Sequence, residues 1–386
     1  MTFEMKRQDI PARPDMPFDL WTVVKQFASK EITRISIPVN FCEPISFLQR
    51  LTEDFEYAYA LEKAATMTDS GEQMAHVAAF SASVYASTSE RMAKPFNPLL
   101  NETFDFDRTD DLGWRAIAEQ VSHHPPRSAL YVEGKGWKCW EDYGIVMKYR
   151  GNYMQIKPEG VSHLLFESGN HYTWNKVITR INNVIIGTMW IDQNGTDEII
   201  NHKNGYKCTL TYAVSNAKES KKKVTGTVVN AAGAKLWSVA GEWDKGMMVA
   251  PASEVKDPDS MIEDENTTAT LVWEKSPPRR NSHLQYNFGQ FAIELNEPEA
   301  GVAPTDSRFR PDVRIFENGN WQEANTAKVT LEEKQRARLR DKENEPDPLW
   351  FKREKIENIG DETYVYLGGY WECKKENDWG RCPKIY

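Results

Sequence analysis

Short stretches in which apolar and polar residues alternate fill the middle of the chain, from about residue 114 to residue 249. Examples are GIVMKYRG, VIIGTMWIDQNG, YKCTLTYAVS, KVTGTVVNAAG and KLWSVAGEWDKG. Gly, Asn, Asp or Pro separates the stretches about every 8–12 residues, which is the spacing of consecutive antiparallel strands. The pattern therefore predicts a large antiparallel sheet that closes, or nearly closes, into a barrel.

Helical spacing occurs on both sides of these strands. In the segment 20–29, apolar residues recur at i, i+3, i+4 and i+7, namely at Leu20, Val23, Val24 and Phe27. This stripe fits either a surface helix packed on the core or a cover over an apolar site. Further helices are expected within 43–67, 71–90 and 322–342. The tail 343–386 carries three tryptophans and is expected to pack on the body of the protein.

Composition narrows the class of protein. The chain has 386 residues, of which 40% are hydrophobic and 11% aromatic, enough for a sizeable core. A net charge of −9 disfavours a nucleic-acid partner. Five widely spaced cysteines without a C-x-x-C pair indicate a reducing compartment and neither a disulfide framework nor structural zinc. With no secretory leader and no apolar run of ~20 residues, we expect a cytoplasmic protein without a metal or cofactor.

The string EQVSHHPP (119–126) is the most unusual in the chain. Proline keeps the residue before it extended, and an extended backbone directs adjacent side chains to opposite sides unless it bends. His123 and His124 are therefore expected to be a poor chelate for one metal ion. Two interpretations stay open from the residues alone: a structural turn with hydrogen-bonded histidines, or an anion-binding or acid–base site.

Two other segments offer groups that suit phosphate. Lys94 and Asn97 each precede a proline in KPFNPLLNETF, and the segment is either a plain connector or a rigid turn that presents a cation and an amide. Lys328, Glu332 and Arg336 recur every four residues, as either an ion-paired exposed face or a phosphate clamp. No phosphate-loop, nucleophile-elbow or zinc-protease motif is present, so the sequence gives little support for catalysis.

Together these strings resemble the oxysterol-binding protein family, and EQVSHHPP matches that family's fingerprint. The resemblance covers nearly the whole chain, and residues from about 18 to 386 resemble one lipid-binding domain. Within the family, the oxysterol-binding proteins themselves are more similar than the distant members. A pleckstrin-homology domain and a receptor-binding two-phenylalanine motif are not visible, so the chain is either a short member or a piece of a longer one. Other similar stretches are IPVNFCEPISFLQRLTEDFEYAYALEKAA, WIDQNGTDEIINHKNGYKC, APTDSRFRPDVRIFENGNW, LEEKQR and YWECKKENDW.

The resemblance implies a mainly β fold with flanking helices (α+β). Its centre is a large incomplete antiparallel β-barrel around a lipid tunnel, with an N-terminal lid and a C-terminal helical subdomain. The expected division is 1–30 for a mobile start and lid helix, 31–110 for the helical segment beside the barrel, 111–295 for the barrel and 296–386 for the C-terminal subdomain.

The resemblance also implies roles for the candidate residues. His123 and His124 correspond to ligands of the 4-phosphate of phosphatidylinositol 4-phosphate. The rest of the headgroup site corresponds to Lys94, Asn97, Lys328, Glu332 and Arg336. The stripe of Leu20, Val23, Val24 and Phe27 corresponds to the lid, and Tyr85 to a polar residue of the tunnel wall. Asn101 stands where the family usually has glycine, which predicts a positive φ there.

The function implied is that of a lipid-transfer protein, and not of an enzyme. It would exchange a sterol for phosphatidylinositol 4-phosphate between membranes, one lipid at a time, in contact with membrane surfaces where endoplasmic reticulum and Golgi meet. Alternatives are a phosphatidylserine/phosphatidylinositol 4-phosphate exchanger, a sterol-responsive sensor or scaffold, and an enzyme that uses His123 or His124 as an acid or base on a phospholipid. The natural sterol, the membranes, the protein partners and the oligomeric state stay open.

Overall fold

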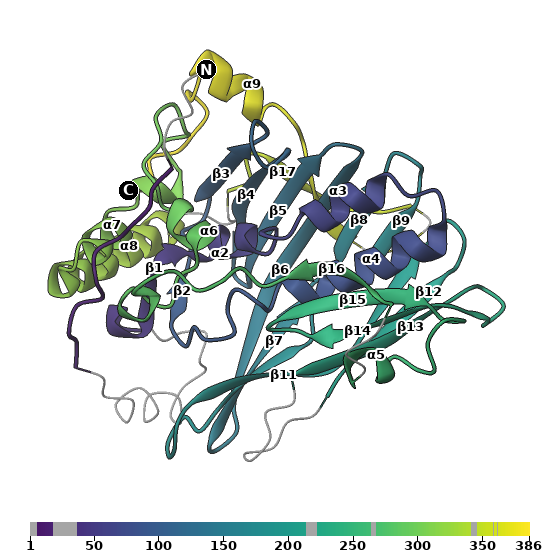
Figure 1. Cartoon of the computed structure of the whole chain (residues 1–386). Coiled ribbons are helices and arrows are strands. Elements are labelled where there is room, and N and C mark those ends of the chain that lie inside the picture. The colour runs from purple at the N-terminus through teal and green to yellow at the C-terminus, as the bar shows by residue number, and fades with distance from the viewer. Residues whose placement is uncertain are drawn as a thin grey trace.

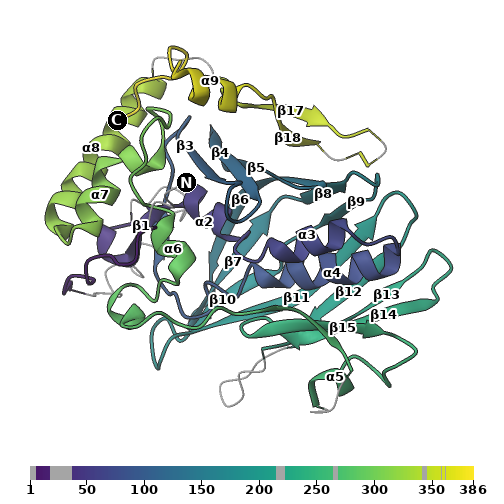
Figure 2. The same ribbon diagram turned by 45° about the horizontal axis from the view of Figure 1, so that its top comes forward.

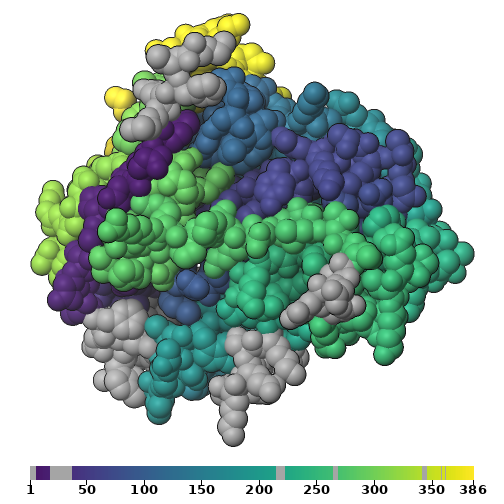
Figure 3. Space-filling view, in the orientation of Figure 1, coloured from purple at the N-terminus to yellow at the C-terminus, as the bar shows by residue number. Residues whose placement is uncertain are grey.

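The computed structural model describes residues 6–17, 37–213, 222–263, 268–340, 346–357, 359–360 and 362–386. The predicted helix over 20–29, with Leu20, Val23, Val24 and Phe27, lies outside these residues. The first described segment, 6–17, runs in purple across the outside of the C-terminal helices (Figure 3). The Arg13 amide donates to the Leu284 carbonyl at 2.7 Å, which ties this segment to the body.

One sheet of 14 strands forms the centre of the molecule (Figure 1). Its main path runs β16-β15-β14-β13-β12-β11-β10-β7-β6-β5-β4-β3, every pairing is antiparallel, and β8 and β9 make a second link between β6 and β11. The end strands β3 and β16 do not pair with each other, so the barrel is incomplete, as predicted. The strands are β3 (Thr103–Arg108), β4 (Trp114–His123), β5 (Pro126–Gly134), β6 (Trp137–Tyr149), β7 (Tyr153–Glu159), β8 (Ser162–Phe166), β9 (His171–Trp174), β10 (Ile178–Asn182), β11 (Trp190–Asn201), β12 (Lys207–Tyr212), β13 (Lys223–Val229), β14 (Lys235–Glu242), β15 (Gly246–Pro251) and β16 (Thr270–Glu274).

Alternating sequence becomes alternating burial in this sheet. Along β12, Cys208, Leu210 and Tyr212 are buried while the residues between them are exposed. Successive side chains of a strand point to opposite faces, so one face of the sheet lines the core and the other meets solvent. The sheet spans residues 103–274, so its first strand begins before residue 111.

Three helices lie against the concave face of the sheet: α2 (Phe47–Glu53), α3 (Tyr59–Ala65) and α4 (Ser70–Ser83) (Figure 2). Nearly every residue of α4 is buried, because its many Ala, Ser and Gly residues allow the sheet to approach on several sides. Asp69 begins this helix by accepting a hydrogen bond from the Glu72 amide at 2.7 Å.

The helical spacing read from 43–67 fails at the start of this segment and in its middle. Cys42–Ser46 is strand β1, which pairs in parallel with β2 (Lys94–Phe96). Pro44 lacks an amide donor, and Ser46 then starts α2 with a capping box in which the side chain of Gln49 accepts from the Ser46 amide at 2.7 Å. A turn separates α2 from α3.

The C-terminal part packs outside the sheet. Its last strands, β17 and β18, form a separate hairpin over β5 and β6. The tail is docked as expected, since Trp350 is fully buried and the Glu119 carboxylate accepts the Leu349 and Trp350 amides at 2.7 and 2.9 Å. The tail also contains regular structure, namely the two strands of this hairpin and a helix, α9. The elements are α6 (Gln290–Glu294), α7 (Pro311–Glu317), α8 (Trp321–Arg340), β17 (Phe351–Lys355), β18 (Glu362–Tyr366) and α9 (Tyr370–Glu376), after a short α5 (Ser260–Glu263); the 3-10 turns are η2 (Val39–Phe41), η3 (Ser282–Leu284) and η4 (Ser307–Phe309).

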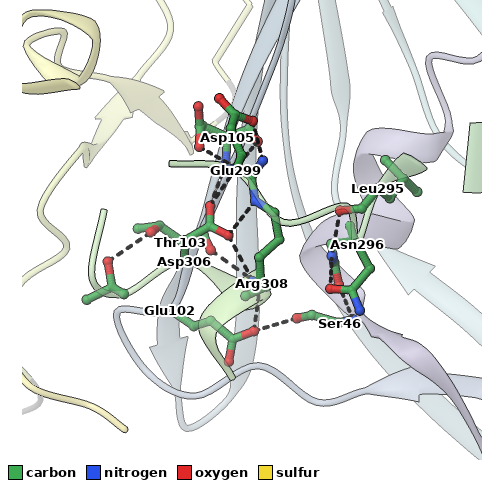
Figure 4. Close-up of polar contacts among 12 residues, drawn as sticks. Ser46, Glu102, Thr103, Asp105, Leu295, Asn296, Glu299, Asp306 and Arg308 are labelled. Atoms are coloured by element: carbon green, nitrogen blue, oxygen red, sulfur yellow. Dashed lines mark hydrogen bonds and ion pairs between the residues drawn. The ribbon is translucent and has the colours of Figure 1, made fainter. Parts of the chain in front are cut away.

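A buried cluster of ion pairs joins β3 to the C-terminal part, and we call it the joint (Figure 4). Arg308 lies at its centre and donates to Asp105 at 2.6 Å and to Asp306 at 2.8 Å. Glu299 also pairs with Arg308, and its carboxylate lies 2.7 Å from the ammonium of Lys374. The joint therefore comprises Asp105, Glu299, Asp306, Arg308 and Lys374, and each of its cations meets two or more carboxylates.

Three further features concern the classes considered from the sequence. All five cysteines are free thiols. Of the helices in the described residues, none is long and apolar enough to cross a bilayer. In the same residues, no group of three or more His, Cys, Asp or Glu side chains is placed to hold a metal ion.

Candidate functional site

Helix α8 forms one side of the site. The ammonium group of Lys328 contacts the carboxylate of Glu332, and the guanidinium of Arg336 lies 3.7 Å from the same carboxylate. These residues recur every four positions and so share one face of the helix. The Lys328 side chain is only 5% exposed, whereas that of Arg336 is 59% exposed. The stripe therefore leads from a buried cation to a solvent-facing one.

Lys94 and Asn97 lie on β2 and in the turn that follows it. The Lys94 ammonium donates to the Asn97 side-chain oxygen at 2.9 Å. Desolvation lowers the pKa of Lys94, and the nearby positive charge of Lys328 and Arg310 lowers it further. The ends of β2 and α8 thus place several cations near one another, which is an arrangement that an anion would relieve.

Arg310 fixes the turn that carries Asn97. Its buried guanidinium donates to the Asn97 carbonyl at 2.6 Å and to the carboxylates of Glu102 and Asp312 at 2.9 and 2.8 Å. The two carboxylates neutralise Arg310, so its role is to hold the backbone in place. No motif in the sequence singles out this residue.

His123 and His124 lie at the turn between β4 and β5. His123 is the last residue of β4 and pairs with Pro126, while His124 and Pro125, joined by a cis peptide bond, form the two-residue turn. The ring centroids are only 4.3 Å apart, with 52° between the planes. The expectation of rings on opposite sides is therefore wrong, because the backbone bends at His124 itself. His123 is partly buried and His124 is exposed.

Gln335 connects the histidine turn to the helix. Its side-chain nitrogen lies 3.1–3.2 Å from the ring nitrogens of His123, and its oxygen accepts from the Leu100 amide at 2.7 Å. Gln335 is buried and stands one residue before Arg336. Through this one side chain, α8 is attached both to the histidine turn and to the turn after β2.

Asn101 has the positive φ that the sequence predicted. Its φ is 64°, and its side-chain amide donates to the Asp347 carbonyl at 3.3 Å. The backbone amide of Asn101 donates to the Gln120 carbonyl at 3.0 Å. The turn that contains Leu100 and Asn101 therefore forms without glycine.

A second polar group lies on the inner face of the sheet. Lys176 pairs with Asp54 at 2.5 Å and Glu141 at 3.2 Å, and its ammonium lies 4.1 Å from the ring centre of Tyr143. Tyr85 is buried close by, and its hydroxyl accepts the Val177 amide at 2.8 Å.

The ring of Tyr85 packs edge-on against Tyr212 at 5.6 Å between centroids. Among the described residues, the hydroxyl of Tyr212 has no hydrogen-bond partner although it is buried. An orphaned hydroxyl of this kind marks a place where a ligand or an ordered water would gain a hydrogen bond.

The family model for oxysterol-binding proteins matches residues 19–375. The chain belongs to this family. The resemblance seen in the sequence is thereby confirmed over nearly the whole chain. Mouse oxysterol-binding protein 2 is 44% identical over 99% of this chain, and yeast oxysterol-binding protein homolog 2 is 36% identical over 97%. The chain spans less than half of the length of either relative, 44% and 31% respectively.

Solved structures of oxysterol-binding family domains have the same fold. The Osh1 ORD domain in complex with ergosterol matches with a TM-score of 0.88 and 33% identity, and covers 99% of this chain and 95% of its own. The Osh3 ORD from Saccharomyces cerevisiae, in complex with PI(4)P, matches with a TM-score of 0.85 and 30% identity over 99% of both chains. The predicted fold class is confirmed by these matches.

Within this family fold, the structure brings six of the seven predicted headgroup residues into two groups beside α8. Lys94 donates to Asn97 and lies near the charges of Lys328 and Glu332. His123 lies beside His124 and contacts Gln335 of α8. The seventh, Arg336, faces solvent beside Glu332. Sequence reasoning missed Gln335, Arg310 and Lys176. A signal existed only for Gln335, which lies three residues after Glu332 on the same helical face.

Proposed function

We propose that this chain carries lipids between membranes, exchanging a sterol for phosphatidylinositol 4-phosphate and holding one lipid at a time. The observation that carries the proposal is the convergence of Lys94, the two adjacent histidines and the α8 stripe. This convergence occurs in a family member whose solved relatives include complexes with ergosterol and with PI(4)P.

The headgroup argument rests on charge. Three cations, Lys94, Lys328 and Arg336, are grouped with one carboxylate, Glu332, so the named set has an excess of positive charge. A phosphate offers several acceptor oxygens and two negative charges, and its charge would favour the protonated form of Lys94, which desolvation disfavours. His123 and His124 would donate to the 4-phosphate, with Gln335 setting the orientation of the first ring.

The argument for the apolar part of the lipid rests on the inner face of the sheet. That face is mostly apolar and aromatic, and burial of a lipid there is stabilised by about 25 cal/mol per Å². We propose that Tyr85 and Tyr212 meet the single hydroxyl of a sterol, because the Tyr212 hydroxyl is buried and lacks a partner in the described residues. Acyl chains and sterol would then compete for one space.

We propose a carrier rather than an enzyme. Exchange needs only two lipids of different affinity and a gradient of one of them, without a covalent step. Residues from about 18 to 386 would act as one lipid-binding domain, peripheral to membranes at contacts between endoplasmic reticulum and Golgi. The lid assigned to 20–29 stays a prediction.

The test is extraction of lipid from vesicles by a variant that carries His123→Ala and His124→Ala together. Loss of two charge-assisted hydrogen bonds, at ~1.5–3 kcal/mol each, should weaken extraction of phosphatidylinositol 4-phosphate at least 100-fold. Binding of a fluorescent sterol should change less than about threefold. His283→Ala is the matched control, since His283 lies in the turn η3 and is not one of the candidate site residues.

A second measurement separates the alternatives. Protein loaded with fluorescent sterol is titrated with vesicles that contain phosphatidylinositol 4-phosphate, and complete displacement is expected at saturation. Sterol retained at full phosphoinositide occupancy contradicts one-at-a-time exchange and favours the sensor or scaffold. Mass spectrometry of copurified lipids that finds phosphatidylserine in place of sterol favours the other exchanger.

A further inference from the structure

Two neighbouring turns project from one end of the sheet, and we call them together the tip. The tip comprises residues 148–154, around the turn between β6 and β7, and residues 180–190, around the turn between β10 and β11. The two hairpins are adjacent because β7 pairs with β10, with Asn182 opposite Tyr153. Their ends reach the lower edge of the molecule in Figure 1, and in the space-filling view teal atoms protrude there (Figure 3).

The tip exposes two isoleucines to solvent. Ile185 is 38% exposed. Ile186 is 76% exposed, the largest exposed fraction among the large hydrophobic residues in the described part of the chain. The neighbouring Val184 is buried, so the turn separates one anchoring residue from two outward ones. Scattered apolar residues at a surface are common, but two adjacent isoleucines at the end of a projection are not explained by packing.

The exposure of these isoleucines is built into the turn by hydrogen bonds. The side-chain oxygen of Asn152 accepts both the Ile185 and the Ile186 amides, at 3.1 and 3.2 Å. The side-chain nitrogen of Asn152 donates to the Ile186 carbonyl at 3.3 Å, and that of Asn183 donates to the Thr188 carbonyl at 2.9 Å. The polar side chains thus satisfy the backbone of the turn and leave the isoleucine side chains outside.

The charge at the ends of the two hairpins differs from that of the whole chain. The whole protein has a net charge of −9, yet residues 144–158 and 177–191 contain no Asp or Glu and four cations: Lys148, Arg150, Lys157 and Arg180. Lys148 and Arg150 are exposed at the tip itself. The guanidinium of Arg180 lies over the ring of Tyr153, 5.4 Å from its centre. Three half-buried aromatic residues, Tyr149, Tyr153 and Trp190, lie on the strands that lead into the two turns.

We propose that the tip docks the protein on an anionic lipid bilayer, with Ile185 and Ile186 inserted among the acyl chains and Lys148 and Arg150 at the headgroups. Apolar side chains flanked by cations and by tyrosine or tryptophan are the combination that suits the interface of a charged bilayer. A hydrophilic partner would not bury the isoleucine side chains, and an uncharged apolar partner would not pair with the cations. The inference rests on the proposed exchange function, which requires the protein to meet membranes.

The experiment measures flotation of the full chain with vesicles that contain neither sterol nor phosphatidylinositol 4-phosphate. One set is phosphatidylcholine alone, and the other has phosphatidylserine added. Ile185→Asn with Ile186→Asn should weaken binding to the anionic vesicles roughly 10- to 100-fold, the effect of withholding one or two apolar side chains. Lys148→Gln with Arg150→Gln should weaken it about 10-fold or more and remove most of its salt dependence.

Leu367→Asn is the matched control, because Leu367 is 50% exposed and lies in the turn after β18, outside the tip. It should bind vesicles as the unchanged protein does. Binding of sterol delivered by cyclodextrin, without vesicles, should be the same in all variants. Failure of sterol and phosphoinositide binding by the unchanged protein would overturn the proposed function, whatever the vesicles show.

The docking proposal is overturned separately. Vesicle binding that is unchanged in both double variants would place the membrane contact elsewhere, and equal loss with Leu367→Asn would show a general effect of exposed apolar residues. A variant that also loses cyclodextrin-delivered sterol would show that the tip is part of the lipid-binding interior and not a docking surface.

Discussion

The joint and the headgroup site both gather charged side chains from distant segments, but they balance the charges differently. In the joint, Arg308 and Lys374 meet three carboxylates, and Arg308 is 4% exposed. In the site, the cations Lys94, Lys328 and Arg336 lie near the carboxylate of Glu332. Buried ions are stable only when they are paired and hydrogen-bonded. We therefore interpret the joint as structure that is complete within the chain, and the site as a cationic surface suited to an anionic ligand.

Removal of the central cation of the joint should destabilise the protein strongly. Removal of a cation of the headgroup site should change the free energy of unfolding only slightly. Arg308→Met leaves Asp105 and Asp306 buried without their guanidinium, and should lower the free energy of unfolding by about 3–5 kcal/mol. Arg336→Met should lower it by no more than about 1 kcal/mol, because its side chain is largely exposed. Urea unfolding measures both values.

Arg353→Met is the control for loss of an ordinary ion pair. Arg353 lies 2.8 Å from Glu362, and both side chains are more than half exposed. Its change should resemble that of Arg336→Met. If Arg308→Met costs as little as Arg353→Met, burial and multiple pairing do not distinguish the joint, and the comparison above fails.

A carboxylate on the inner face of the sheet sharpens the same contrast, because no cation pairs with it among the described residues. Asp197 is buried, and its hydrogen bond in the described residues is with the Asn175 amide, at 3.2 Å. Burial raises the pKa of Asp197 to about 7. Between the unfolded value and this one, the folded state binds more protons, so this carboxyl makes the protein less stable as the pH rises.

Asp197→Asn should remove that dependence. From about pH 5 to about pH 8, the stability of the Asn variant relative to the unchanged protein should rise by on the order of 1–3 kcal/mol. Thermal or urea unfolding at several pH values measures the difference. If the stabilities of the two proteins change in parallel over this range of pH, ionisation of Asp197 does not destabilise the fold. A carboxylate inside the sheet would then be stable without a cation.

Much of the fold was predictable from local pattern. The alternation in β12 and β13 was sufficient to predict strands, and the four-residue recurrence on α8 predicted the helix, because one side of each element meets solvent and the other does not. Strand β1 was missed because its residues are buried throughout, which removes the alternation on which the prediction depends. Its parallel partner β2 lies about 50 residues later in the chain.

The candidate site was predictable only in part. Lys94 and the histidines came from strings that resemble a family, whereas Gln335 and Arg310 act on residues more than 200 positions away. The helical spacing places Gln335 on the same face as Glu332, but it does not distinguish a glutamine that orients a histidine from one that faces water. The close approach of the two histidine rings was also missed, because the direction of the side chains depends on where the hairpin turns.

The smallest predicted effect concerns Asn101, in the turn that lies between the joint and the site. On one side of it, Glu102 accepts from Arg310, and on the other, Leu100 donates to Gln335. Asn101→Gly and Asn101→Ala both lose the side-chain bond to Asp347, but only alanine opposes the φ of 64°. Alanine should therefore cost about 1 kcal/mol more than glycine in urea unfolding. Equal stabilities would mean that the backbone moves out of the left-handed region at no cost. In that case the turn changes its conformation in the alanine variant. Because Gln335 is hydrogen-bonded to Leu100 in this turn, lipid extraction by the alanine variant should then differ from that by the glycine variant.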